Sequence, residues 1–247
     1  MKLLKGICAV ILISLGLSAL AGCGSSTVPS RTSNSPARHA SSAVTSPPNA
    51  APSSPRPAQP APEVVLSRVT YPWHWPNDVN KPGSVQHIYP APPLPTLTAI
   101  GVGDHPSEPG GRPYNRISFT FTGAFPSYRF SFVKTLVSDP GSRLIPLAGN
   151  GALKVTFSHA QAHTASGQSS VVSQPPSHLG FSRLVSWAQA GDFDGVLTYG
   201  IGISWPIPQS NPQIAIRATE VEEITAQNQR LYTVAIDIDA TAVISHA

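Results

Sequence analysis

Cysteine and charged residues are scarce in this sequence. Among its 247 residues there are two cysteines, and charged residues make up 11%. So few thiols exclude a cysteine-rich metal site or a disulfide framework, and a folded domain must therefore depend on a hydrophobic core. The formal net charge is +4, with no basic stripe along the chain, so we expect no binding to nucleic acid.

The N-terminus has the pattern of a secretory leader. Lys2 and Lys5 precede an uncharged, mostly apolar run from Gly6 to Leu20, and small residues follow. The run is shorter than the roughly 20 apolar residues of a membrane span. Its end, "LSALAGC", resembles a bacterial lipobox, which predicts cleavage before Cys23 and a diacylglycerol on its sulfur. Ordinary signal cleavage nearby, leaving a free thiol, is the alternative.

Processing at this position predicts residues 1–22 as the leader and a mature protein anchored by lipid to the cell membrane, on its extracytoplasmic face. Cys8 would be lost with the leader and Cys23 would be modified, so no cysteine would remain for a disulfide, a metal site or catalysis. Loss of Lys2 and Lys5 would lower the net charge from +4 to +2.

Two segments of unusual composition follow the leader. Residues 23–62 are rich in Ser, Pro, Ala and Thr, a composition that cannot bury enough apolar surface to fold and predicts a disordered tether. Residues 63–96 combine many prolines with Trp73 and Trp75, and we expect little regular structure in this arm. Its rings either pack on the following domain or form an exposed platform for a ligand.

Residues 97–247 carry the signal of an all-β domain. The segments "RISFTFTG", "SYRFSFV", "ALKVTF" and "LYTVAIDI" place apolar residues at every second position, as half-buried strands do. Clusters of Gly, Pro, Asn and Asp separate them. This pattern predicts an antiparallel β-sandwich or barrel. The one helical candidate is the segment "SHAQAHTA".

Paired aspartates are the first candidates for a chemical site. Asp192 and Asp194 lie in "GDFDGV", which lacks the further oxygen ligands of a calcium loop, whereas Asp-Gly predicts a turn before a strand. Asp237 and Asp239 would share one face of a strand. That face is either solvated or, with carboxylates roughly 7 Å apart, comparable to a glycosidase site. Hydrolysis by these aspartates is the least favoured function.

Other motifs for catalysis or cofactor binding are incomplete. His159 and His163 have the spacing of metal ligands on a helix, but the glutamate of a zinc protease motif is missing. "YGIGI" lacks the third glycine of a dinucleotide fingerprint, so Gly200 and Gly202 predict a bulge or a close backbone approach. No G-x-S-x-G nucleophile motif occurs. We therefore predict a non-enzymatic protein without a metal or other cofactor.

The order of the strand segments resembles a known family. "YNRISFTFTGAFPSYRFSFV", "PLAGNGALKVTFSHAQAHTASG", "AGDFDGVLTYGIGI" and "LYTVAIDI" are similar to the actinobacterial AMIN-like lipoprotein domain over about residues 97–242. The matching positions are Arg116, Tyr128, His163, Asp192, Gly195 and Asp237. Kinship with the AMIN domains of envelope amidases and secretins implies a β-sandwich that binds peptidoglycan. The longer segments "HPSEPGGRPYNR" and "ATEVEEITAQNQR" depart from the family pattern and would alter any surface there.

The leader, the tether and the resemblance predict an envelope lipoprotein whose β-sandwich binds peptidoglycan or wall glycan without catalysis. Aromatic rings would stack on sugar rings, assisted by polar side chains. The candidate ligand-binding residues are Trp73, Trp75, Trp187, Tyr199, Arg116 and Tyr128, of which Trp187 is equally a candidate for the core. The alternative is a protein-interaction module that recruits an envelope enzyme through an exposed strand edge.

Overall fold

The computed structural model describes four stretches of the chain, residues 61–88, 93–106, 111–205 and 213–241. The predicted leader, the lipidation site Cys23 and nearly all of the tether over residues 23–62 lie outside these stretches and remain predictions. Within the described stretches no helix is long and apolar enough to cross a membrane.

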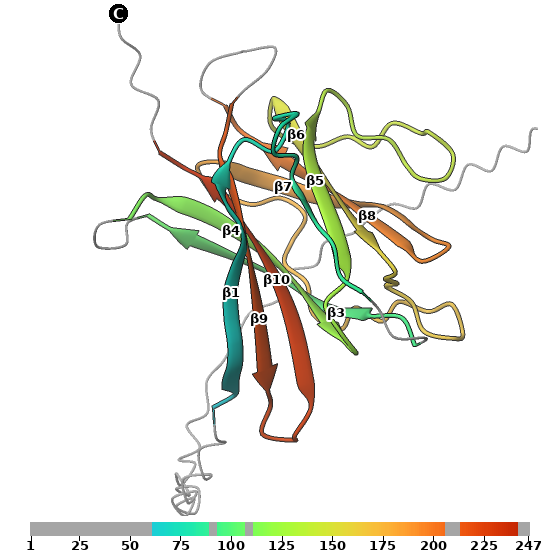
Figure 1. Cartoon of the computed structure of the whole chain (residues 1–247). Helices are drawn as coiled ribbons and strands as arrows, with labels where there is room; N and C mark the ends of the chain where they lie inside the picture. Colours follow the sequence, from blue (N-terminus) through green and yellow to red (C-terminus); the bar gives the residue numbers. More distant parts are fainter. Residues whose placement is uncertain (1–60, 89–92, 107–110, 206–212, 242–247) are drawn as a thin grey trace, which may run out of the picture. The chain divides into compact units, whose positions relative to one another are not determined.

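The described residues form two antiparallel sheets of five strands each, which pack as a sandwich (Figure 1). The first sheet has the order β1-β9-β10-β4-β3 and the second β2-β5-β6-β8-β7. The strands are β1 (Glu63–His74), β2 (Ser84–Val85), β3 (Thr96–His105), β4 (Tyr114–Thr122), β5 (Ser127–Val133), β6 (Gly151–Ser158), β7 (Leu184–Phe193), β8 (Val196–Ile203), β9 (Ile216–Ile224) and β10 (Arg230–Asp239). The predicted all-β sandwich is confirmed.

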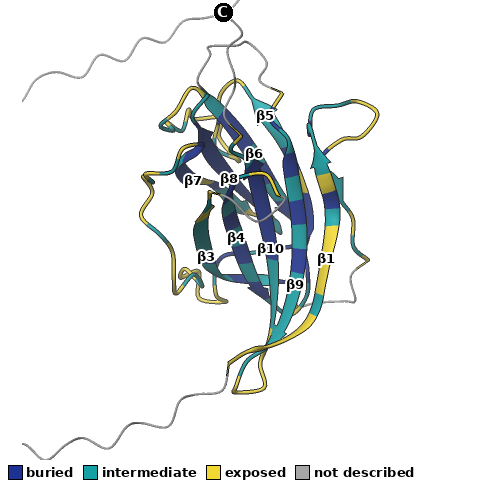
Figure 2. Ribbon diagram, turned by 90° about the vertical axis from the view of Figure 1, so that its left-hand side faces the viewer, coloured by how far each residue is buried: buried dark blue, intermediate teal, exposed yellow. Residues whose placement is uncertain are grey.

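The core fills the space between the two sheets, where alternate residues of each strand point inward. Ile117, Phe119 and Phe121 of β4 are all 0% exposed. The ring of Phe119 lies 5.0 Å from that of Phe157 on β6 and 5.1 Å from that of Tyr199 on β8, measured between centroids. Figure 2 shows this burial as dark stripes along β4, β10 and β8. The alternating segments therefore form strands because each supplies one apolar face to this layer.

The first strand lies where little regular structure was predicted. Glu63–His74 pairs with β9 and forms one edge of the first sheet, so that prediction is wrong for these residues. The pairing register shifts between Val64 and Leu66 and again between Val69 and Tyr71. Such bulges interrupt the alternation of side chains between the two faces, which explains why no strand pattern is visible in this segment of the sequence.

The helix expected over "SHAQAHTA" is also wrong. His159 has a φ of 57°, in the left-handed region that an α-helix cannot use, and residues 158–165 contain no helical turn. His159 and His163 therefore share no helix face, and the geometry that would have made them metal ligands is not formed.

The turn and glycine predictions for "DGVLTYGIGI" are confirmed. Asp194 and Gly195 have φ angles of 51° and 71° and join β7 to β8 in a tight hairpin, as an Asp-Gly pair does in a type I′ turn. A Cβ at Gly200 would lie 2.0 Å from Leu136, and one at Gly202 would lie 2.1 Å from the carbonyl oxygen of Ala148. The two glycines thus let the loop between β5 and β6 pack closely on β8.

Candidate binding site

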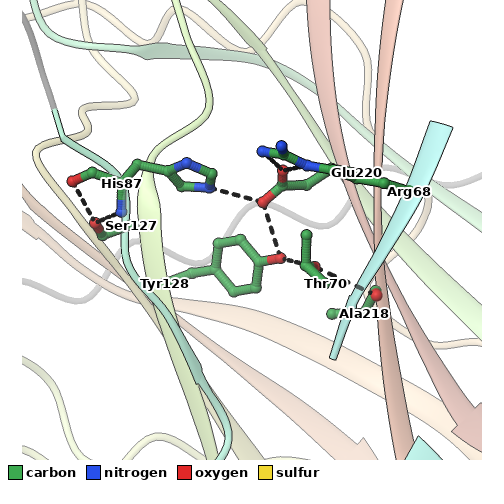
Figure 3. A network of polar contacts seen from close by, with 7 residues as sticks. All are labelled: Arg68, Thr70, His87, Ser127, Tyr128, Ala218 and Glu220. Atoms are coloured by element: carbon green, nitrogen blue, oxygen red, sulfur yellow. Dashed lines mark hydrogen bonds and ion pairs between the residues drawn. The ribbon is translucent and has the colours of Figure 1, made fainter. Parts of the chain in front are cut away.

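A buried carboxylate connects the edge strand β1 with the second sheet. Glu220 of β9 is 0% exposed, and its two oxygens have separate partners (Figure 3). Oε2 accepts hydrogen bonds from Nε and Nη2 of Arg68 at 3.0 and 2.8 Å. Oε1 lies 2.7 Å from Nε2 of His87 and accepts a bond of 3.1 Å from the hydroxyl of Tyr128. Arg68 belongs to β1, His87 to the segment after β2, and Tyr128 to β5. Glu220 therefore connects β9 with three other parts of the fold.

Tyr128 belongs to this network and to the core. Its side chain is 1% exposed, and its hydroxyl lies 2.6 Å from Oγ1 of Thr70 as well as donating to Glu220. Burial, and then the charge of Glu220, raises the pKa of Tyr128, so the phenol stays protonated at neutral pH. The prediction that Tyr128 contacts a ligand is therefore corrected, because a ring enclosed between two sheets offers no surface for stacking.

A second buried carboxylate, Asp237 of β10, lies on the opposite face of the same sheet. It is 0% exposed, and it alternates with Ile236 and Ile238, which point into the core. Nε and Nη2 of Arg116 donate to its two oxygens at 2.6 and 3.1 Å, and Nε of Arg217 donates to Oδ2 at 2.8 Å. The expected solvated face is therefore wrong at Asp237, since arginines from both neighbouring strands cover it.

Aromatic rings contact Arg217 and the nearby Arg112. The guanidinium carbons of Arg217 and Arg112 lie 4.8 and 5.1 Å from the ring centroid of Trp73. Arg217 also lies 5.0 Å from the centroid of Tyr114, whose ring meets that of Trp73 at 6.1 Å. Arginine is attracted to aromatic faces in this geometry. We call the following residues the arginine–tryptophan patch: Trp73, Arg112, Arg116, Arg217 and Asp237.

The shared carboxylate gives this patch its chemical character. Asp237 binds the guanidinium groups of both Arg116 and Arg217, so both groups are fixed in orientation at this surface. Beside the patch, Gly103 and Gly101 of β3 lie opposite Arg116 and Ser118. A Cβ at Gly103 would lie 3.1 Å from Nε2 of His105, and one at Gly101 would lie 2.7 Å from Oγ of Ser118, so the glycines make room for these neighbouring side chains.

Asp192 lies in a strand and not in the turn. Its Oδ2 accepts a hydrogen bond of 3.1 Å from the backbone N–H of Ala162 and lies 2.8 Å from Nδ1 of His163. Asp192 thus attaches the segment after β6 to β7. The predicted turn role is corrected for Asp192 and confirmed for Gly195, whose φ is 71°.

The remaining predicted ligand residues are not members of the patch. Trp187 and Tyr199 are 7% and 1% exposed and belong to the core cluster, and the indole N–H of Trp187 donates to the carbonyl of Pro176 at 3.0 Å. Trp75 is half-buried just beyond β1. Trp187 and Tyr199 are therefore corrected to core residues, because their rings are not available to stack on a sugar. Trp73 and Arg116 are the predicted residues that the structure brings together.

Sequence reasoning missed Arg112, Arg217 and Glu220. For Arg217 a signal was present, because the alternation of "QIAIRA" sets it on the face opposite Ile216 and Ala218. The sequence does not say that this strand lies beside the one carrying Asp237, and that pairing gives Arg217 its role.

Comparison with known protein families gives one match, which covers part of the sandwich. Residues 95–211 match the model of the AMIN-like domain. The chain contains an AMIN-like domain. The matched residues run from the start of β3 past the end of β8 and include Arg116. No curated protein and no solved structure gives a match.

AMIN-like domains are generally non-catalytic binding modules, associated with peptidoglycan or with protein partners. In this chain β1, β9 and β10 lie outside the matched residues, yet they complete the first sheet. Trp73, Arg217 and Asp237 come from these strands, so the patch combines the AMIN-like region with strands on either side of it. The family assignment of Asp237, expected from a resemblance up to about residue 242, remains a prediction.

Proposed function

We propose that the AMIN-like domain binds peptidoglycan through the arginine–tryptophan patch. Peptidoglycan offers sugar rings together with the carboxylates of its peptide stems. The planar guanidinium groups of the patch match carboxylates in geometry and charge. The half-buried ring of Trp73 lies beside Arg217 and contributes apolar surface on which a sugar ring can stack.

One observation carries the proposal. Asp237 is completely buried and binds Arg116 and Arg217 on the outer face of the sheet, next to Trp73. Arginines held in this way lose little conformational entropy when a ligand arrives, which favours binding. A domain needing only a stable sheet would gain little by burying a carboxylate, since buried ion pairs stabilise folds weakly.

Attachment to the membrane is part of the same proposal. A lipid on Cys23 would hold the protein at the extracytoplasmic face of the cell membrane, and the tether over residues 23–62 would let the domain reach the wall. Cys23→Ser should release the protein from the membrane fraction of disrupted cells. Equal membrane association of Cys23→Ser and the parent would contradict the anchor while leaving peptidoglycan binding open to its own test.

Sedimentation of the full-length protein with insoluble peptidoglycan tests the binding. Arg112 and Arg230 are a matched pair: each is an exposed arginine in an ion pair on the first sheet, with Asp239 and Glu222 respectively. Arg112→Gln should reduce the bound fraction, Trp73→Ala should reduce it further, and Arg230→Gln should bind like the parent. Sedimentation of the parent no better than a control protein would overturn the proposal.

A second function, recruitment of a protein partner, rests on the edge strand β1. Its outer edge is unpaired in the described part of the chain, and Val64, Val65 and Val69 are 56%, 48% and 54% exposed. A partner strand can add to such an edge. Crosslinking in cells should then recover a reproducible partner from the parent but not from Val65→Pro, and recovery of no partner from the parent would exclude this function.

A further inference from the structure

The outer face of the second sheet carries a cleft of different character. Its volume is about 390 Å³, and it is lined by Arg129, Ser131 and Val133 of β5 and by Lys154 and Thr156 of β6. No acidic side chain lies among these lining residues. The cleft therefore combines two cations with two hydroxyl groups and no compensating carboxylate.

The pairing of β5 with β6 directs these polar groups to one place. Arg129 lies opposite Thr156, and Ser131 lies opposite Lys154, so all four side chains project from the same face of the sheet. Diagonal neighbours in such a ladder are about 7–8 Å apart at the backbone. Long arginine and lysine side chains span that separation easily. Both cations can therefore reach one group lying above the two hydroxyls.

The loop between β5 and β6 covers the neighbouring strand on this face of the sheet. The loop between β5 and β6 packs on β8, where Leu136 would overlap a Cβ at Gly200. It thus covers β8 beside the cleft, whose lining residues all belong to β5 and β6. At this boundary Thr198 of β8 pairs with Thr156 in the ladder. Thr198 is 0% exposed, and its hydroxyl oxygen has no hydrogen-bond partner in the part of the chain that the structure describes.

The two cations differ from most others in the described residues. Several arginines bind carboxylates or backbone carbonyls: Arg68, Arg112, Arg116, Arg183, Arg217 and Arg230. Within the same stretches, Arg129 and Lys154 form no ion pair. The two residues lie on the paired strands β5 and β6. Two like charges on adjacent strands repel each other unless an anion lies between them.

We propose that this cleft binds a phosphate group. A phosphate group has four oxygens arranged as a tetrahedron around phosphorus, so it can accept hydrogen bonds from both cations and from both hydroxyls together. Arg129 would supply paired N–H donors and Lys154 a compact charge, while Ser131 and Thr156 would donate from below. A planar carboxylate would need fewer donors. The phosphate ester can belong to a lipid headgroup or to a soluble molecule.

Titration of the full-length protein with inorganic phosphate and with glycerol phosphate, at constant ionic strength, tests this site. Backbone amide NMR signals of residues 129–131 and 154–156 should shift. The double variant Arg129→Gln/Lys154→Gln should bind at least about tenfold more weakly, because two charge-assisted hydrogen-bonding groups are lost. The matched control Lys134→Gln/Arg143→Gln removes the same charge from exposed loop positions outside the cleft and should bind like the parent.

Vesicles separate the two sources of phosphate. Binding of soluble glycerol phosphate assigns a soluble ester, whereas binding to phosphatidylglycerol vesicles alone, and not to phosphatidylcholine vesicles, assigns a lipid headgroup. Binding to neither, or equal weakening in both double variants, overturns the proposal.

All four changed side chains lie at the surface, so thermal melting of both double variants should match that of the parent. Arg112→Gln should keep phosphate binding, which distinguishes this site from the peptidoglycan patch.

Discussion

Glu220 and Asp237 are buried carboxylates on neighbouring strands of one sheet, and they face opposite ways. Both are 0% exposed. Glu220 points toward the second sheet and is bound by Arg68, His87 and Tyr128. Asp237 points away from it and is bound by arginines of the two adjacent strands. The same chemical group therefore serves two purposes, according to where its partners come from.

The difference lies in what each carboxylate positions. The partners of Glu220 come from separate parts of the chain, so its bonds hold the edge strand β1 and the segment around His87 to the sandwich. The partners of Asp237 already belong to the same sheet, and pairing of the strands would hold their backbones without it. What Asp237 adds is the orientation of two guanidinium groups at the surface. Glu220 thus stabilises the fold, whereas Asp237 orients the side chains of a binding surface.

The largest expected effect is on stability at Glu220. Glu220→Gln turns an oxygen that accepts bonds into an N–H donor facing other donors, so we expect the free energy of unfolding to fall by about 3 kcal/mol. Denaturant unfolding measures this change. The matched control is Glu222→Gln, on the same strand, whose surface pair with Arg230 should contribute less than about 1 kcal/mol. Equal losses of unfolding free energy in the two variants would contradict a special role of Glu220 in stabilising the fold.

A smaller loss is expected at Asp237. Asp237→Asn removes the carboxylate charge that Arg116 and Arg217 both bind, but their side chains are 30% and 24% exposed, and water relieves part of the cost. We expect the free energy of unfolding to fall by about 2 kcal/mol, measured by the same denaturant titration. A loss larger than that of Glu220→Gln would reverse the comparison between the two carboxylates.

Removal of one hydroxyl tests the Glu220 network more finely. Tyr128→Phe loses the hydrogen bond to Glu220 and should reduce the free energy of unfolding by about 1.5 kcal/mol. A double-mutant cycle with Thr70→Val measures the coupling of the two hydroxyls, which lie 2.6 Å apart. Additive effects, with no coupling between them, would argue against one connected network.

Alkaline pH should act on the same residue. The ordinary pKa of tyrosine is 10.0, and burial together with Glu220 raises the pKa of Tyr128 in the folded protein. Below pH 10 its contribution to stability is complete. Above pH 10 the unfolded chain releases the proton while the folded protein keeps it, so stability falls by about 1 kcal/mol between pH 10 and 11. Tyr128→Phe should lose less stability over this interval, and equal losses would contradict the raised pKa.

Local patterns in the sequence predict much of the fold but little of the site. The strands β4, β5, β6 and β10 show clean alternation, because each has one face in the core. The strand β1 does not, because its bulges shift the register. The sites depend on which strands become neighbours. Arg116 and Asp237 are 121 residues apart in the chain and Arg68 and Glu220 are 152 apart, so no local pattern reveals these pairs.

Binding of Asp237→Asn and Glu220→Gln to insoluble peptidoglycan, measured side by side at a temperature where both are folded, tests the central claim most directly. We expect Asp237→Asn to bind about tenfold more weakly than the parent, because its arginines are no longer held in place. Glu220→Gln, although less stable, should bind as the parent does. Equal binding by the two variants, whether both retain or both lose affinity, would contradict the account in which Glu220 stabilises the fold and Asp237 orients the binding surface.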